Sequence, residues 1–245
     1  MSPEDRLEQI LALISQKGTI SVNELTAALY VSTATVRRDL TELSRRGLIV
    51  RSFGGAVSTS RAALQMLPAH TVQQAETPLG SHAAQFAKEK SVVFLGASPL
   101  LLTLLPYLRE RPSLTVVTDS ARAAIELTGH VAQLFCTGGR YDPAGGFFCG
   151  QQAAETVESF RYDCAFFACD GLGADGSLLF RSAEEMSVLQ TAAEHAKTRV
   201  LLCAREQLSD SAAWSLLKLR QMDAVVTDAP DLIGRDYAGT VISIV

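Results

Sequence analysis

The sequence lacks the features of a membrane, secreted or metal-binding protein. No apolar run approaches the roughly 18–20 residues that a membrane span requires, and the charged N-terminal segment is unlike a signal sequence. The five cysteines include no CxxC pair, and the four histidines are scattered without the spacing of metal ligands. We therefore expect a cytoplasmic protein with buried, reduced thiols and with no metal or cofactor.

The chain also lacks a strong excess of either charge. Its formal net charge is −4, which argues against indiscriminate binding to polyanions. The charge is uneven, however, because residues 32–57 contain five arginines and only two acids, Asp39 and Glu42. This distribution indicates one local basic contact face on an otherwise acidic molecule.

Residues 32–47 predict an amphipathic helix that begins at a capping serine. Ser32 can accept a backbone N–H of the first turn, and Gly47 can end the helix after two arginines. The apolar stripe that we expect to be buried consists of Val36, Leu40, Leu43 and Leu48. Off this stripe, at the end where a recognition helix meets DNA base edges, lie Thr33, Thr35, Arg37 and Arg38.

The flanking segments complete a winged helix-turn-helix. Residues 48–57 predict a β-hairpin, in which Gly54 and Gly55 would supply the positive φ of a tight turn. Upstream, residues 4–17 and 21–30 have helical periodicity, and Ser21 with Glu24 forms a capping box. The short turn before Ser32 has the length expected between the two helices of such a motif. An ordinary three-helix bundle with surface arginines is the alternative.

The rest of the chain predicts a second, larger domain. Residues 58–80 are rich in Ser, Thr, Ala and Gln and contain two prolines, which indicates a linker. From residue 81 to 245, short apolar runs alternate with helical patterns, as in a mostly parallel, Rossmann-like α/β fold. The expected strands are 91–95, 114–118, 131–136, 164–169, 199–203, 224–228 and 240–245, and the expected helices are 99–109, 120–129, 150–160 and 182–197.

Ligands of parallel sheets bind beyond the carboxyl ends of the strands. Loop glycines there can present backbone N–H groups to an anion, carboxylates can accept hydrogen bonds from a polyol, and arginines can pair with a phosphate. The candidate effector-binding residues are Ser98, Asp119, Ser120, Gly138, Gly139, Arg140, Asp170, Gly171, Arg181 and Glu185, with Arg205 as a further cation.

The order of motifs resembles the DeoR-type bacterial transcription regulators. Residues 21–57 match the family pattern, in which the motifs eLa, vS, T-[IV]-RRDL and GGA follow one another. The last two motifs correspond here to Thr35–Leu40 and Gly54–Ala56. The resemblance implies a repressor of a carbohydrate or small-metabolite operon, acting as a homodimer or homotetramer. Its partners would be a double-stranded DNA operator and a small-molecule effector, bound by a sensor domain related to ribose-5-phosphate isomerase. The implied DNA contacts are Ser32, Thr33, Thr35, Arg37, Arg38, Arg51, Gly54 and Gly55.

The sensor part departs from the family pattern. Gly96–Leu100 stands where the family has D-x-G-T-T, Ala204–Gln207 stands where it has D-x-S-K, and Asp119 replaces an asparagine. An added carboxylate disfavours a phosphate dianion, so we expect an effector other than a typical phosphosugar. The effector could be a neutral or cationic polar molecule, or an anion bound by Arg140, Arg181 or Arg205. Alternatively, the pocket is vestigial and the domain only oligomerises.

An isomerase-like fold also raises the possibility of catalysis. Aldose–ketose isomerisation requires a positioned base with an acid or a lysine nearby. Asp119, Asp170 or Glu185 could act as the base, but no lysine occurs in these loops. A DNA-reading domain placed in front makes catalysis the less economical account, and we expect a regulator rather than an enzyme.

Overall fold

The computed structural model describes residues 3–52, 54–58, 77–205, 212–232, 237 and 239–243. The chain divides into two compact units, Met1–Leu67 and Pro68–Val245. This division falls within the predicted linker 58–80. Residues 59–76 of that linker lie outside the described residues, so its conformation stays a prediction.

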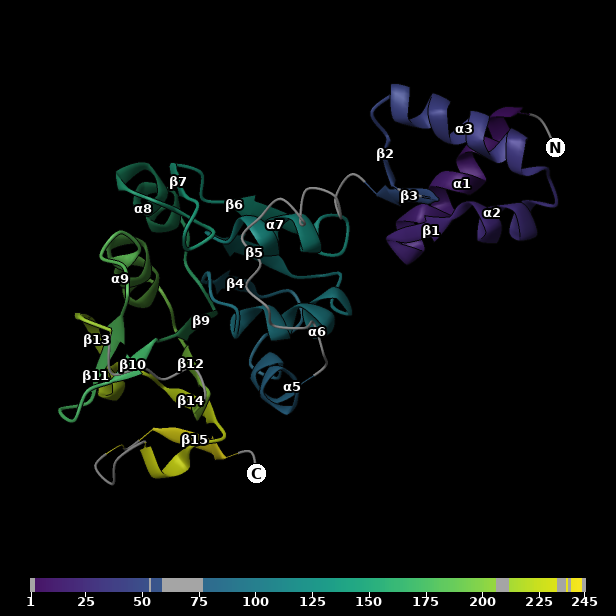
Figure 1. Cartoon of the computed structure of the whole chain (residues 1–245). Coiled ribbons are helices and arrows are strands. Elements are labelled where there is room, and N and C mark those ends of the chain that lie inside the picture. The colour runs from purple at the N-terminus through teal and green to yellow at the C-terminus, as the bar shows by residue number, and fades with distance from the viewer. Residues whose placement is uncertain are drawn as a thin grey trace. The chain divides into compact units, whose positions relative to one another are not determined.

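The first unit is a winged helix-turn-helix (Figure 1). Its core is made by one apolar face of each helix, because residues such as Ile10, Leu25 and Leu40 recur at helical spacing and are fully buried. A three-stranded antiparallel sheet in the order β1-β3-β2 closes it. The elements are α1 (Pro3–Lys17), β1 (Thr19–Ser21), α2 (Val22–Leu29), α3 (Thr33–Arg45), β2 (Ile49–Ser52) and β3 (Gly55–Ser58).

Local signals set the ends of α2 and α3. Ser21 and Glu24 form the predicted capping box at α2, and the Ser32 hydroxyl accepts the Thr35 N–H, which begins α3. Helix α3 ends at Arg45 with Arg46 as its C-cap, one residue before the predicted Gly47. Gly47 has a φ of +72° and reverses the chain, and the Leu48 N–H donates to the Leu43 carbonyl at 3.0 Å. This reversal redirects the chain, so the prediction that Leu48 is buried was wrong. Leu48 is 45% exposed, and the next residue, Ile49, enters the core.

The wing needs its two glycines for different reasons. Gly54 has a φ of +80°, as predicted, but Gly55 does not have a positive φ. Gly55 instead pairs with Ser21, and a Cβ there would lie 2.3 Å from the Ile20 carbonyl oxygen. Gly55 therefore lets β3 pack closely against β1, a strand that the sequence pattern did not reveal.

The second unit is built on a seven-stranded parallel sheet in the order β15-β14-β12-β9-β4-β5-β6. The parallel, Rossmann-like α/β prediction is confirmed. The strands are β4 (Val92–Leu95), β5 (Thr115–Thr118), β6 (Gln133–Cys136), β9 (Cys164–Ala168), β12 (Arg199–Cys203), β14 (Ala224–Thr227) and β15 (Thr240–Ser243). The edge strand β6 is largely exposed rather than buried on both faces, and Cys136 at its end is exposed, contrary to expectation.

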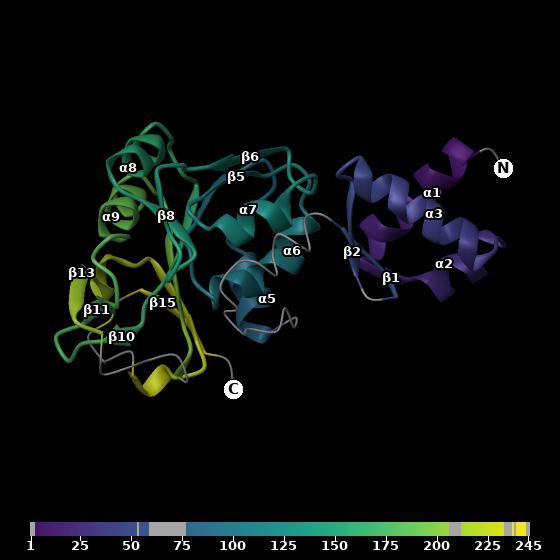
Figure 2. The ribbon, with the colours of Figure 1, turned by 45° about the horizontal axis from the view of Figure 1, so that its top comes forward.

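Helices cover both faces of this sheet, as Figures 1 and 2 show. One face packs against α5 (Pro78–Ala84), α6 (Leu105–Arg109) and α7 (Ala121–Leu127). The other packs against α8 (Gln151–Glu158) and α9 (Met186–Glu194). The predicted helix 99–109 is shorter than expected, because a 3-10 helix at Leu101–Leu104 precedes α6.

Two antiparallel additions were not predicted. A hairpin of β7 (Arg140–Asp142) and β8 (Phe147–Cys149) follows β6, and a small sheet is formed by β10 (Gly171–Leu172), β11 (Ser177–Phe180) and β13 (Trp214–Lys218). Short 3-10 helices also form at Leu219–Gln221 and Pro230–Leu232. The hairpin is tied to the carboxyl end of β5, since the Phe148 N–H donates to the Asp119 carbonyl at 2.8 Å. It thereby covers part of the strand edge where a ligand was expected.

Candidate DNA interface and effector site

The arginines of the recognition helix fall into two groups. Arg37 and Arg38, in the N-terminal half of α3, are exposed, and their guanidinium groups have no hydrogen bond or ion pair to any described residue. Arg45 and Arg46, at its C-terminal end, both pair with Glu42, each at 2.8 Å. These two guanidinium groups hold the pKa of Glu42 down at about 2, mainly through the Arg45 hydrogen bond. The unpaired positive charge of α3 is thus in its N-terminal half, the part of a recognition helix that in general meets base edges.

The second acid of this segment, Asp39, stabilises the fold. Its buried carboxylate accepts two hydrogen bonds from the Arg6 guanidinium, at 2.6 and 3.0 Å, which fasten α1 to α3. Such a bidentate pair fixes orientation as well as distance. Asp39 therefore does not neutralise Arg37 or Arg38.

A polar row connects the recognition helix to the wing. The Arg51 guanidinium, on β2, donates to the Thr41 hydroxyl at 3.0 Å, and that hydroxyl donates to the Arg37 carbonyl at 2.8 Å. Because Arg37 and Thr41 are four residues apart, they lie on one helix face. Thr41 was missed by the sequence analysis, since a lone threonine within a helix carries no signal of its own.

The other predicted DNA contacts have different surroundings. Thr33 is exposed, whereas Ser32 and the half-buried Thr35 share a hydroxyl–hydroxyl hydrogen bond of 2.9 Å at the helix start. Gly54 is exposed at the wing turn, and its carbonyl accepts the Val22 N–H. Gly55 is buried because it pairs with Ser21 of β1, and it is therefore not exposed to solvent.

In the second unit, Asp119 is completely buried at the carboxyl end of β5. Neither of its carboxylate oxygens has a hydrogen-bond partner among the described residues. Burial raises its pKa to about 7, and the nearby N–H groups of Asp119 and Ala97 act in the opposite direction. A buried carboxylate without a partner is costly, and native structures seldom contain one without a reason.

The negative charge of Asp119 affects the pKa of Glu185, which is also buried. Its pKa is raised to about 8, first by burial and then by Asp119, Asp170 and Asp142 in that order. Each influence on Glu185 opposes ionisation, and no cation lowers its pKa. The charges of Asp119, Asp170 and Asp142 all act on Glu185, so these four acids lie in the same part of the sensor unit.

Each arginine that was expected to bind a phosphate forms an ion pair with an acid at the surface. Arg140 donates to Glu184, and Arg205 donates to Asp231. The Arg181 guanidinium lies 3.8 Å from the Asp170 carboxylate, which also accepts the Arg181 N–H. Each of these three arginines thus has its own acid.

The remaining predicted effector residues have structural roles. Ser98 and Ser120 use their hydroxyls to accept the N–H groups of Leu100 and Ala123, the latter at the start of α7. Gly138 and Gly139 have positive φ, and a Cβ on Gly139 would lie 2.7 Å from the Cys149 carbonyl. Gly171 is buried in β10, paired with Leu179.

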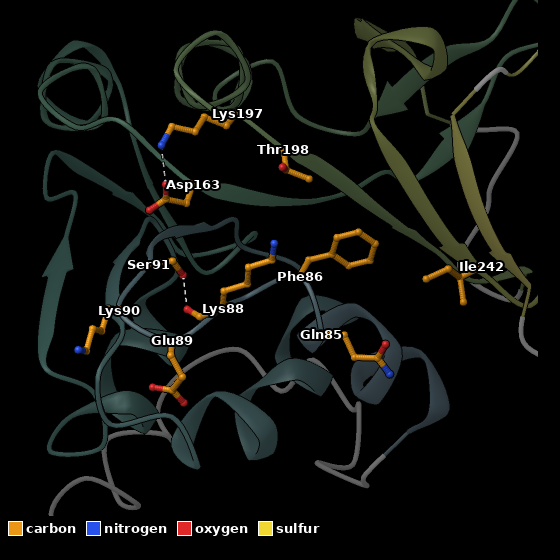
Figure 3. A pocket seen from close by; sticks show the side chains of 10 residues that line it. All are labelled: Gln85, Phe86, Lys88, Glu89, Lys90, Ser91, Asp163, Lys197, Thr198 and Ile242. Atoms are coloured by element: carbon orange, nitrogen blue, oxygen red, sulfur yellow. Dashed lines mark hydrogen bonds and ion pairs between the residues drawn. The ribbon is translucent and has the colours of Figure 1, made fainter.

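A cavity of about 820 Å³ opens at the opposite, amino-terminal edge of the parallel strands (Figure 3). It was not predicted, and no candidate effector residue lines it. Lys197 and Asp163 form an ion pair of 2.8 Å across part of its wall, and Lys88, Lys90 and Phe86 also line it. The figure shows these side chains coming from the segment before β4 and from the starts of β9 and β12.

Fold and site together define a two-unit DNA-binding protein with a winged helix and an α/β sensor-type unit. The DeoR-like helix-turn-helix domain family matches residues 6–62, and the DeoR C-terminal sensor domain family matches residues 72–229. The chain belongs to the DeoR family of transcriptional regulators, a family of DNA-binding regulators rather than of enzymes.

Curated relatives cover nearly the whole chain. The uncharacterised transcriptional regulator YgbI of Escherichia coli K12 is 30% identical over 93% of this chain and 91% of its own length. The transcriptional repressor CsqR of the same organism is 29% identical, over 91% and 87%. The lactose phosphotransferase system repressor of Staphylococcus epidermidis RP62A is 27% identical, over 95% and 94%.

Solved structures with a similar fold include ribose 5-phosphate isomerases. The isomerase A of Methanocaldococcus jannaschii has a TM-score of 0.38 at 16% identity, over 54% of this chain and 52% of that one. That of Plasmodium falciparum has a TM-score of 0.38 at 7% identity, over 54% and 50%.

Within the described residues, no helix is both long and apolar enough for a membrane crossing, and no group of three or more potential ligands could hold a metal ion.

Proposed function

We propose that the protein is a ligand-controlled repressor of an operon for the use of a carbohydrate or another small metabolite. The observation that carries the DNA-binding role is the pair of unpaired, exposed arginines, Arg37 and Arg38, at the capped end of α3. The names of the CsqR and lactose phosphotransferase system repressors support repression and, for the second, a link to sugar metabolism. A protein with this role works in the cytoplasm, where the operator lies.

In this proposal, residues 1–57 form the DNA-binding domain, 58–80 the linker and 81–245 the sensor and oligomerisation domain. Thr33, Thr35, Arg37 and Arg38 contact base edges or the adjacent phosphates. A homodimer or homotetramer presents two or more such heads to repeated half-sites, because one head carries too little charge for tight binding. Effector binding then favours an arrangement of heads that does not fit the operator.

Arg51 tests the assignment of the wing to the DNA backbone. Arg51→Ala is expected to weaken binding to operator and to unrelated DNA by similar factors, because a phosphate contact carries no sequence information. It should also reduce the slope of log K against log salt by about one for each phosphate that Arg51 neutralises. Fluorescence anisotropy with both DNAs at several salt concentrations measures this.

A matched control is Arg46→Ala, since Arg46 is tied to Glu42 at the other end of α3. Arg46→Ala should give the same slope of log K against log salt as the natural protein. A weakening by Arg51→Ala that is confined to the operator would instead make Arg51 a base-reading residue.

The alternatives receive less support from the residues. The carboxyl edge of the parallel sheet carries carboxylates that could act in isomerase chemistry, but the loops that carry them contain no lysine. Lys197 lies at the amino-terminal edge instead, paired with Asp163. A sensor domain that only oligomerises gives no reason for a buried, unpartnered Asp119. We therefore favour an effector-binding role for the carboxyl edge.

A further inference from the structure

The carboxyl edge of the sensor sheet has a one-sided charge pattern. Asp119 is fully buried, Glu185 is 9% exposed, and the Asp170 side chain is one-third exposed, so acids extend from the interior to the surface. The arginines at this edge pair with acids other than Asp119 and Glu185: Arg140 with Glu184, Arg181 with Asp170 and Arg205 with Asp231. The innermost part of the edge thus has carboxyl groups and no described counter-ion.

Asp119 supplies the second, independent sign of a ligand. Both of its oxygens are buried without a partner among the described residues, although a threonine and a serine flank it in the sequence. Thr118 and Ser120 use their hydroxyls for the backbone instead, Thr118 to the Leu95 carbonyl and Ser120 to the Ala123 N–H. The buried phenol oxygen of Tyr141, on the covering hairpin, also has no partner in the described part of the chain.

We propose that the effector carries a protonated amine together with hydroxyl groups, and that the amine binds the carboxylates of Asp119 and Glu185. The inference rests on the proposed sensor function and specifies its ligand. An ammonium group supplies three N–H donors and one positive charge, which matches the buried carboxyls of Asp119 and Glu185, for which the described residues supply no ion-pair partner. A phosphate dianion would meet like charges at low dielectric, and the arginines that could bind it are paired.

The hairpin β7–β8 gives a route for this ligand to reach the site. It is held over Asp119 by backbone bonds from Phe148 to Asp119 and from Ala121 to Gly146, and it belongs to a separate two-stranded sheet. Opening it exposes Asp119 without breaking the parallel sheet. Binding of an amine would therefore alter the position of residues 140–149, and this movement is the link from ligand to the rest of the sensor.

Three compounds that share one carbon chain test the charge class directly. They are 1-amino-1-deoxy-D-sorbitol, D-sorbitol and D-sorbitol 6-phosphate, titrated into the full-length protein at pH 7.5 in a calorimeter. We expect the amine to bind at least tenfold more tightly than either other compound. Because the amine favours ionised carboxyls, its binding should release protons, which titrations in two buffers of different ionisation enthalpy reveal.

Variants of the site keep the test specific. Asp119→Asn, which places an asparagine where the family pattern has one, should reduce amine affinity at least tenfold and should lower the number of protons released, with the remaining release coming from Glu185. Glu158→Gln, on the exposed side of α8, should change neither. Tighter binding of the phosphate or of sorbitol, or no preference for the amine, would overturn the inference.

Operator binding is measured separately on the ligand-free proteins. Asp119→Asn should retain operator affinity within about twofold, since the DNA-binding unit is unchanged. If the amine fails while the operator is bound selectively, only the ligand assignment is wrong. If the natural protein does not select the operator at all, the proposed function fails, whatever the titrations show.

Discussion

Arg37→Ala is expected to weaken binding to the specific operator by about 1–3 kcal/mol, or roughly 5- to 150-fold, for each bidentate pairing with a base that it removes. Arg37 is exposed on α3, and no described acid holds its guanidinium, so the full set of donors is free for a guanine edge. Affinity for unrelated DNA should fall much less. Competition binding at one fixed salt concentration measures both affinities.

Arg45→Ala provides the matched comparison on the same helix. Arg45 is exposed but hydrogen-bonded to Glu42 at 2.8 and 3.0 Å, near the end of α3. Its removal should change specific affinity far less than Arg37→Ala does, because Glu42 already holds the Arg45 guanidinium at the end of α3 away from the expected base contacts. Equal effects of the two variants, or unchanged affinity for Arg37→Ala, would contradict the assignment of the N-terminal half of α3 to base recognition.

Asp119→Asn is expected to stabilise the ligand-free sensor unit above pH 7. The pKa of Asp119 is raised by burial from 3.8 to about 7, so the folded state holds its proton more tightly than the unfolded state does. Stability is therefore lost as the pH rises from about 4 to about 7, by about 1.4 kcal/mol for each unit of pKa shift. The free energy of unfolding of the natural protein should decrease by up to about 4 kcal/mol as the pH rises through this window. The variant has no ionisable group at position 119, so its free energy of unfolding should not show this decrease.

The gain at pH 8 should be smaller than that loss, because asparagine still buries an amide that needs partners, at a cost of about 1–3 kcal/mol. Urea unfolding between pH 5 and pH 8 measures the difference between the two proteins. Glu185, with a pKa raised to about 8, produces a further slope in the same direction in both. Superimposable pH profiles would mean that Asp119 has a partner that neutralises it in solution.

The winged helix could be predicted almost entirely from sequence because its signals are local. Ser21, Ser32 and Gly47 act within a few residues: the two serines are N-caps, and Gly47 is the left-handed residue directly after the C-cap of α3. The error at Leu48 has the same origin. Periodicity extends a helical stripe past the residue where a left-handed glycine has already turned the chain.

Long-range pairings account for what could not be predicted in the sensor unit. Apolar runs located the seven parallel strands, but the β7–β8 hairpin and the β10-β11-β13 sheet are short and mixed in polarity. Arg140 and Glu184 are 44 residues apart in sequence, and Arg205 and Asp231 are 26 apart. No spacing rule connects such partners, so arginines that looked available for a phosphate proved to be occupied.

Asp119 shows the limit of residue type as evidence. From the sequence, Asp119 is a carboxylate at the end of a strand, and a turn exposed to water could contain the same residue. Only the packing of the hairpin over β5 makes it a buried group with two oxygens that have no described partner. The functional weight of the residue comes from what surrounds it, and the surroundings are set by chain segments that lie after it.

Binding of the full-length protein to the DNA upstream of its own gene tests the central claim most directly. The affinity should be measured against a scrambled duplex of equal length at salt concentrations from about 50 to about 200 mM. We expect saturable, selective binding of the upstream DNA at each salt concentration, with an affinity that decreases as salt rises. Equal affinity for both duplexes throughout that range would contradict a sequence-reading regulator.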